Sequence, residues 1–148
     1  MVLSCIDSRT SAELIFDQGL GDIFSVRIAG NVLNEDILGS MEFACELAGS
    51  RLIVVLGHSR CGAVKGACSH VQLGHLTGLV AKIAPAVQEV EMGRSADVPD
   101  AEFIEQVALA NTRRQTRAVV ERSPILRRLL DEGKIGLVGA MHRWRPAR

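Results

Sequence analysis

Residues 52–62 read Leu-Ile-Val-Val-Leu-Gly-His-Ser-Arg-Cys-Gly, and this stretch decides the fold that the sequence predicts. The first five residues are apolar and three of them are β-branched, which favours a strand that is buried on both faces. A glycine ends the run, and His58 and Cys61 follow where a helix is expected to begin. Two soft metal ligands at the carboxyl end of a buried strand indicate half of a metal site.

The composition favours one globular domain over residues 1–148. The chain has 47% apolar residues and a mean hydropathy of +0.19, which argues against disorder. Lys and Arg number 17, as do Asp and Glu, so no strong field for nucleic acid is expected. The longest apolar runs are too short to cross a bilayer. We therefore expect a cytoplasmic protein without a nucleic-acid or membrane partner.

Strand and helix patterns alternate along the chain. This alternation predicts an α/β domain with a mainly parallel central sheet of about four strands flanked by helices. Pro85 is expected to kink or split a helix, and residues 94–99 to form a linker. The expected strands are 1–6, 23–28, 52–56 and 135–141, and the expected helices are 11–16, 34–47, 61–70, 76–92, 100–122 and 124–130.

A partner for His58 and Cys61 is available at the end of the first expected strand, where Cys5 lies. If the first and third strands are neighbours, the three side chains can converge on one ion. Two thiolates and one imidazole suit zinc, and three protein ligands leave a fourth position open. The alternative is that the His-x-x-Cys spacing is accidental and Cys5 is a small buried residue. For Cys45 and Cys68, burial on helical faces is favoured over metal ligation.

Asp7 and Arg9 lie just beyond Cys5 and are two residues apart. In an extended segment this spacing places both side chains on one side. An Arg–carboxylate pair would keep Asp7 ionised and oriented, so that it could accept a hydrogen bond from a zinc-bound water. The alternative is an ordinary surface ion pair in a turn.

Four blocks of sequence resemble the β-class carbonic anhydrases in order and spacing. They are Cys-Ile-Asp-Ser-Arg (5–9), Arg-Ile-Ala-Gly-Asn (27–31), Ser-Met-Glu-Phe-Ala (40–44) and Gly-His-Ser-Arg-Cys-Gly (57–62). The first and last correspond to the zinc and dyad motifs of that family, and the similarity runs from Val2 to about His142.

The resemblance implies a function and a set of site residues. Cys5, His58 and Cys61 would be the zinc ligands, and Asp7 and Arg9 the catalytic dyad. Zinc-bound hydroxide, oriented by the dyad, would hydrate carbon dioxide reversibly to bicarbonate and a proton. In some members the aspartate becomes a fourth zinc ligand in a closed form. The resemblance also implies a homodimer or a dimer of dimers.

Both ends depart from the family pattern. The helices that usually precede the first strand are absent, and residues 143–148 diverge from the usual continuation. The chain therefore resembles a truncated member. Two alternatives stay open: a zinc-binding homologue without activity, and a related hydrolase of carbon disulfide or carbonyl sulfide.

Overall fold

Four strands form the sheet of this chain, in a computed structural model that describes residues 1–94 and 100–144. They lie in the order β2-β1-β3-β4, and every neighbouring pair is parallel. Their bounds are β1 Val2–Ser4, β2 Ser25–Arg27, β3 Leu52–His58 and β4 Gly136–His142. The predicted parallel α/β sheet is confirmed, and so is the adjacency of the first and third strands.

The helices follow the sequence pattern, with one difference. They are α1 Ala12–Ile15, α2 Glu35–Glu42, α3 Gly62–Cys68, α4 Gly74–Ala81, α5 Ala84–Glu91, α6 Asp100–Arg122 and α7 Pro124–Asp131, with a short 3₁₀ turn at Ala29–Asn31. The helix predicted over 34–47 changes to a π-helical turn at Phe43–Leu47. The predicted split of the helix over 76–92 at Pro85 is confirmed, since Pro85 stands in the first turn of α5, where its missing N–H is tolerated. The linker expected at 94–99 lies mostly outside the described residues.

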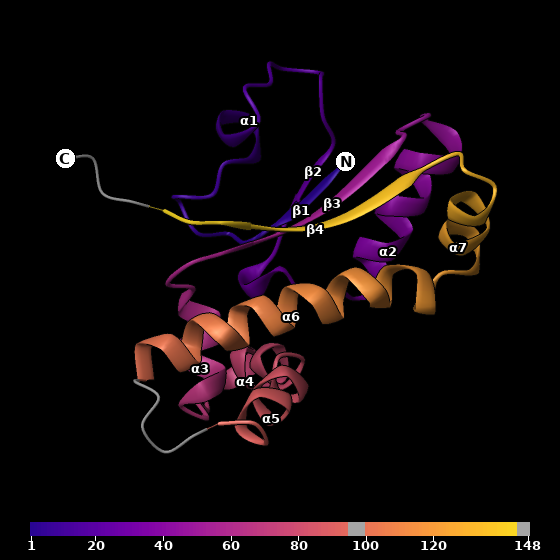
Figure 1. The fold of residues 1–148 in the computed structure, drawn as a ribbon. Helices are drawn as coiled ribbons and strands as arrows, with labels where there is room; N and C mark the ends of the chain where they lie inside the picture. The colour runs from indigo at the N-terminus through magenta and orange to yellow at the C-terminus, as the bar shows by residue number, and fades with distance from the viewer. Residues whose placement is uncertain (95–99, 145–148) are drawn as a thin grey trace.

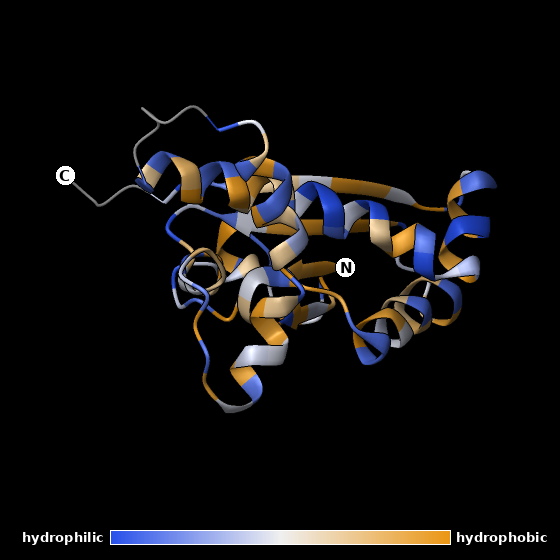
Figure 2. Ribbon diagram, turned by 90° about the horizontal axis from the view of Figure 1, so that it is seen from below, coloured by the Kyte–Doolittle hydropathy of each residue, from blue (hydrophilic) through white to orange (hydrophobic). Residues whose placement is uncertain are grey.

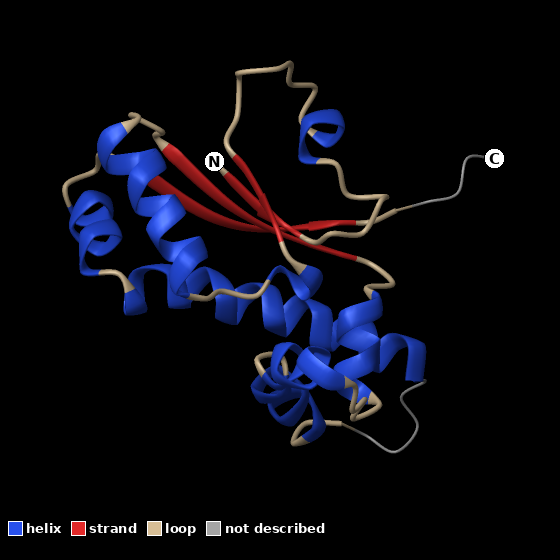
Figure 3. Ribbon diagram, turned by 180° about the vertical axis from the view of Figure 1, so that it is seen from behind, coloured by secondary structure: helices blue, strands red, loops and turns tan. Residues whose placement is uncertain are grey.

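The two faces of the sheet are covered unequally. Figures 1 and 3 show α2, α6 and α7 on one side of the strands, with α1 on the other. Leu3, Ile53 and Val55 face the thicker side and join the largest apolar cluster, whereas Val54 and Leu56 face the α1 side. In Figure 2 the strands are mostly hydrophobic, while the helices carry both hydrophilic and hydrophobic residues. The central strands β1 and β3 are therefore buried on both faces, whereas the edge strands β2 and β4 are partly exposed.

β3 runs two residues further than the apolar pattern predicts. Gly57 and His58 pair with Met141 and His142 of β4, so the imidazole stands on the last residue of a strand. A backbone that is fixed by strand pairing gives His58 a defined position at the carboxyl edge of the sheet. None of the helices within residues 1–94 and 100–144 is long and apolar enough to cross a membrane.

Alanine at Gly57 is expected to destabilise the protein. α6 approaches β3 so closely that a Cβ at this position would overlap Oγ1 of Thr112 and Sδ of Met141. Overpacking of this kind costs about 1–3 kcal/mol of unfolding free energy, which thermal or denaturant unfolding would measure. Gly39→Ala is the matched control, because a Cβ on Gly39 of α2 would meet no atom within 4 Å, and it should be neutral or stabilising. Equal stability of the two variants would contradict the close approach of α6.

Candidate metal centre

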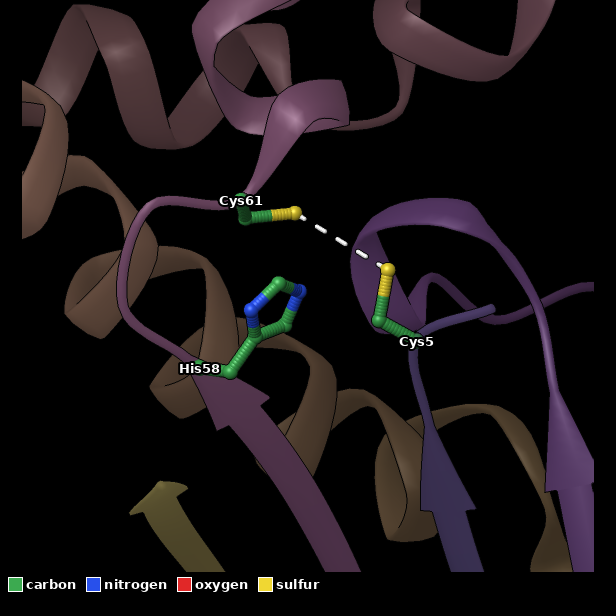
Figure 4. Close-up of side chains that lie close together, drawn as sticks. All are labelled: Cys5, His58 and Cys61. Atoms are coloured by element: carbon green, nitrogen blue, oxygen red, sulfur yellow. Dashed lines mark hydrogen bonds between the residues drawn. The ribbon is translucent and has the colours of Figure 1, made fainter. Parts of the chain in front are cut away.

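Three side chains converge at the carboxyl edge of the sheet. Cys5 follows β1, His58 ends β3, and Cys61 is the residue before the first turn of α3. Their ligand atoms all lie within 4.8 Å of one another, and all three residues are buried. Figure 4 shows the two sulfurs and the imidazole ring directed toward a common centre. The structure thus brings together the three residues that the sequence singled out as metal ligands.

The distances suit a tetrahedral zinc ion. The Sγ atoms of Cys5 and Cys61 are 3.9 Å apart, and two thiolates bound at about 2.3 Å to one tetrahedral zinc lie about 3.8 Å apart. Nε2 of His58 is buried and has no hydrogen-bond partner. Its other ring nitrogen, Nδ1, lies 2.9 Å from the carbonyl oxygen of Ser59, which fixes the tautomer with the Nε2 lone pair free. A buried lone pair beside two thiols is what a metal would satisfy.

The two cysteine sulfurs lie within hydrogen-bond distance of each other. The Cys61 thiol hydrogen-bonds to Cys5 and lowers the pKa of Cys5 to about 4, although burial opposes this shift. The backbone N–H of Gly30 also donates to the Cys5 sulfur at 3.3 Å. The same contact between the cysteines raises the pKa of Cys61, and burial raises it further. For His58, burial is the largest influence and lowers the pKa, but the neighbouring Cys5, Asp7 and Ser59 carbonyl together outweigh it, so the pKa is raised. The lowered pKa of Cys5 favours a thiolate, which would attract a metal cation to the cluster.

The loop that carries Cys5 is fixed by residues from elsewhere in the chain. Arg27, at the end of β2, donates from Nε to the Cys5 carbonyl at 2.9 Å and from a terminal nitrogen to the Asp7 carbonyl. The Thr10 hydroxyl is within hydrogen-bond distance of the same two carbonyls. Sequence reasoning placed Arg27 in a family block but did not predict these contacts. They hold the backbone on which both the sulfur and the carboxylate stand.

The turn after β2 supports the other side of the cluster. Gly30 has φ +69°, and a Cβ there would overlap Ile83 of the helical layer, so glycine is required both for conformation and for space. Asn111 of α6 donates to the Gly30 carbonyl at 2.8 Å. Asn111 was not anticipated, since nothing in the pattern of α6 distinguishes it from other core-facing positions.

Asp7 and Arg9 form a bidentate ion pair beside the cluster. Arg9 Nε lies 2.8 Å from Asp7 Oδ1, and a terminal nitrogen lies 2.7 Å from Oδ2. The Arg9 backbone N–H also donates to Oδ1. These hydrogen bonds, led by the guanidinium contact, hold the pKa of Asp7 well below its usual range. A carboxylate has about four acceptor positions, so one on Oδ2 is left for a further donor.

The remaining cysteines lie outside the metal cluster. Cys45 is buried in the main apolar cluster and Cys68 is half-buried beside the helical one. Burial raises the pKa of both thiols, which keeps them neutral. Both behave as small apolar residues, in agreement with the prediction for them.

A cavity of about 1010 Å³ borders the cluster on the side of Cys61. Its lining combines apolar and charged groups from the loop after β3, from α3, from α6 and from the segment after β4: Ser59, Arg60, Cys61, Lys65, Asp100, Ala101, Glu102, Ile104, Glu105, Arg143 and Trp144. The cavity gives small molecules an open space next to the cluster.

The sequence of this chain is similar to those of known enzymes. The family model described as carbonic anhydrase matches residues 1–147. The chain is 37% identical over 147 residues to carbonic anhydrase 2 of Mycobacterium tuberculosis, a match covering 96% of this chain and 68% of the relative. The chain belongs to the β-class carbonic anhydrase family. A carbonic anhydrase of Mycolicibacterium smegmatis is also 37% identical over the same share of its length.

Solved structures agree on the fold of this family. The β-carbonic anhydrase CcaA superposes with a TM-score of 0.83 at 24% identity, covering 96% of this chain and 73% of the other. A chain from the structures of two tetrameric β-carbonic anhydrases of Sordaria macrospora gives a TM-score of 0.83 at 23% identity, covering 94% of this chain and 74% of the other. Carbonic anhydrases are lyases, so membership of the family supports an enzyme of that class.

Proposed function

We propose that this chain catalyses the reversible hydration of carbon dioxide to bicarbonate and a proton at a zinc ion held by Cys5, His58 and Cys61. The observation that carries the proposal is the Cys-His-Cys cluster, with its 3.9 Å sulfur separation and its unpartnered imidazole nitrogen. When bound there, zinc supplies the nucleophile, because it lowers the pKa of coordinated water from 15.7 to about 7.

Asp7 and Arg9 are proposed to orient the attacking water. Asp7 is ionised, since Arg9 holds its pKa low, and it has one acceptor position left for the attacking water. Accepting that hydrogen bond directs a lone pair of the water oxygen toward the carbon of the substrate. Arg9 neutralises the carboxylate and keeps it away from the cluster, which is the arrangement that an open fourth ligand position requires.

Association of chains is part of the proposal. The solved structures that resemble this chain include tetramers, which supports the predicted homodimer or dimer of dimers. A single domain over residues 1–148 and a cytoplasmic location stay predictions.

Zinc removal is the test of the proposed function. Purified protein loaded with one equivalent of zinc is expected to hydrate carbon dioxide in a stopped-flow indicator assay, to lose this activity with a chelator, and to regain it on adding zinc. Carbon disulfide and carbonyl sulfide, assayed in parallel, should be turned over more slowly. A folded, zinc-loaded protein without zinc-dependent hydration would contradict the proposal, and faster turnover of a sulfur substrate would reassign it.

A further inference from the structure

Trp144 ties the segment after β4 to the loop between His58 and Cys61. Its backbone N–H donates to the Ser59 hydroxyl at 3.1 Å, and the Ser59 backbone N–H donates to the carbonyl of His142 at 3.0 Å. Sequence patterns assign no role to this segment. In the structure, its first two residues line the cavity beside Cys61.

The indole ring of Trp144 lies against two guanidinium groups. Cζ of Arg9 is 5.3 Å from the ring centroid, and Cζ of Arg60 is 5.8 Å from it. Both distances fall within the range of cation–π attraction, for which tryptophan is the strongest partner. Arg9 therefore contacts an aromatic face while its nitrogens bind Asp7.

Contacts besides the bidentate pair with Asp7 hold the Arg9 side chain, which is 29% exposed. Arg9 also donates to the Arg60 carbonyl at 3.2 Å. Arg60 has φ +55°, and its N–H donates to Glu105 of α6 at 2.7 Å, so this carbonyl is itself held in place. The ring and the carbonyl together define where the guanidinium lies.

We infer that Trp144 is a positioning residue whose indole ring holds the Arg9 guanidinium against Asp7 and so keeps the carboxylate in its bidentate orientation. The inference deepens the proposed function and rests on it. Trp144 lies against Arg9 and is not one of the three cluster residues, so it acts through Arg9.

Two substitutions of Trp144 distinguish the effect of its aromatic ring from the effect of its size. Trp144→Leu keeps an apolar side chain but has no aromatic face, and it should lower kcat about twofold to fivefold, the factor that roughly 0.5–1 kcal/mol of cation–π attraction corresponds to. Trp144→Phe keeps a weaker face and should fall between Trp144→Leu and the wild type. KM and bound zinc should stay unchanged in both. Arg60→Ala removes the other cation over the same ring and should reduce kcat less than Trp144→Leu does.

A measurement on Arg9 itself tests the contact independently of activity. Protons over an aromatic face are shielded, so the Nε–H resonance of Arg9, assigned by its loss in Arg9→Lys, should move downfield in Trp144→Leu and remain shielded in Arg60→Ala. An unmoved resonance, equal kcat in the Phe and Leu variants, or loss of zinc from Trp144→Leu would overturn the inference. An inactive wild type would refute the proposed function instead, and the resonance would still decide whether Trp144 positions Arg9.

Discussion

Cys61→Ala is expected to lose its zinc and, with it, all carbon dioxide hydration above the uncatalysed rate. Cys61 lies 3.9 Å from Cys5 and is buried, and its removal leaves Cys5 and His58 of the three-residue cluster. Two remaining ligands are too few for a tight zinc site. Metal analysis of the purified variant should find zinc near zero, against about one per chain in the wild type.

Cys68→Ala is the matched control for this loss. Cys68 lies at the end of α3, the helix that Cys61 precedes, and stands outside the cluster. Its removal should leave both zinc content and activity in place. Zinc retained by a folded Cys61→Ala protein would show that the ligand set is wrong.

Asp7→Asn is expected to keep zinc but to lower kcat by about 10²- to 10⁴-fold, the usual contribution of a positioned proton acceptor. The amide keeps the size of the carboxylate but loses its charge, so Arg9 has lost its ionic partner and the attacking water its oriented acceptor. Metal analysis and stopped-flow hydration on the same sample separate this outcome from that of Cys61→Ala.

Asp36→Asn makes the same chemical change far from the cluster. Asp36 is exposed in the first turn of α2, and the variant should retain wild-type kcat. A rate for Asp7→Asn within about threefold of the wild type would fall below the contribution expected of an acid–base group and would leave the Asp7–Arg9 pair a structural role only.

The convergence of Cys5, His58 and Cys61 was predictable because each step follows from a local pattern. The apolar run 52–56 marks a buried strand, and ligands at the carboxyl ends of adjacent parallel strands meet at one edge. The prediction assumed that the first and third strands are neighbours, and the β1–β3 pairing confirms it. The Asp7–Arg9 pair was predictable for a similar reason, since two residues of separation bring the groups together within one loop.

The supporting contacts were not predictable, because they join segments that are remote in the sequence. The hydrogen bond from Asn111 to Gly30 spans 81 residues, and that from Trp144 to Ser59 spans 85. The sequence shows both residues, but no local pattern shows which distant residue each of them contacts. The helix predicted over 34–47 ended differently for a related reason: helical periodicity does not distinguish an α-helical last turn from the π-helical one at 43–47.

Because β1 pairs with β3, zinc bound at the ends of these strands would stabilise the folded state as well as take part in catalysis. Cys5 and Cys61 are 56 residues apart in the chain, so the unfolded polypeptide does not present the assembled site, and the ion binds the native state preferentially. By mass action, free zinc at a thousand times its dissociation constant would add about 4.1 kcal/mol to the free energy of unfolding. Such a protein would be long-lived where zinc is plentiful and prone to unfolding and degradation where it is scarce, so its abundance would follow the metal supply.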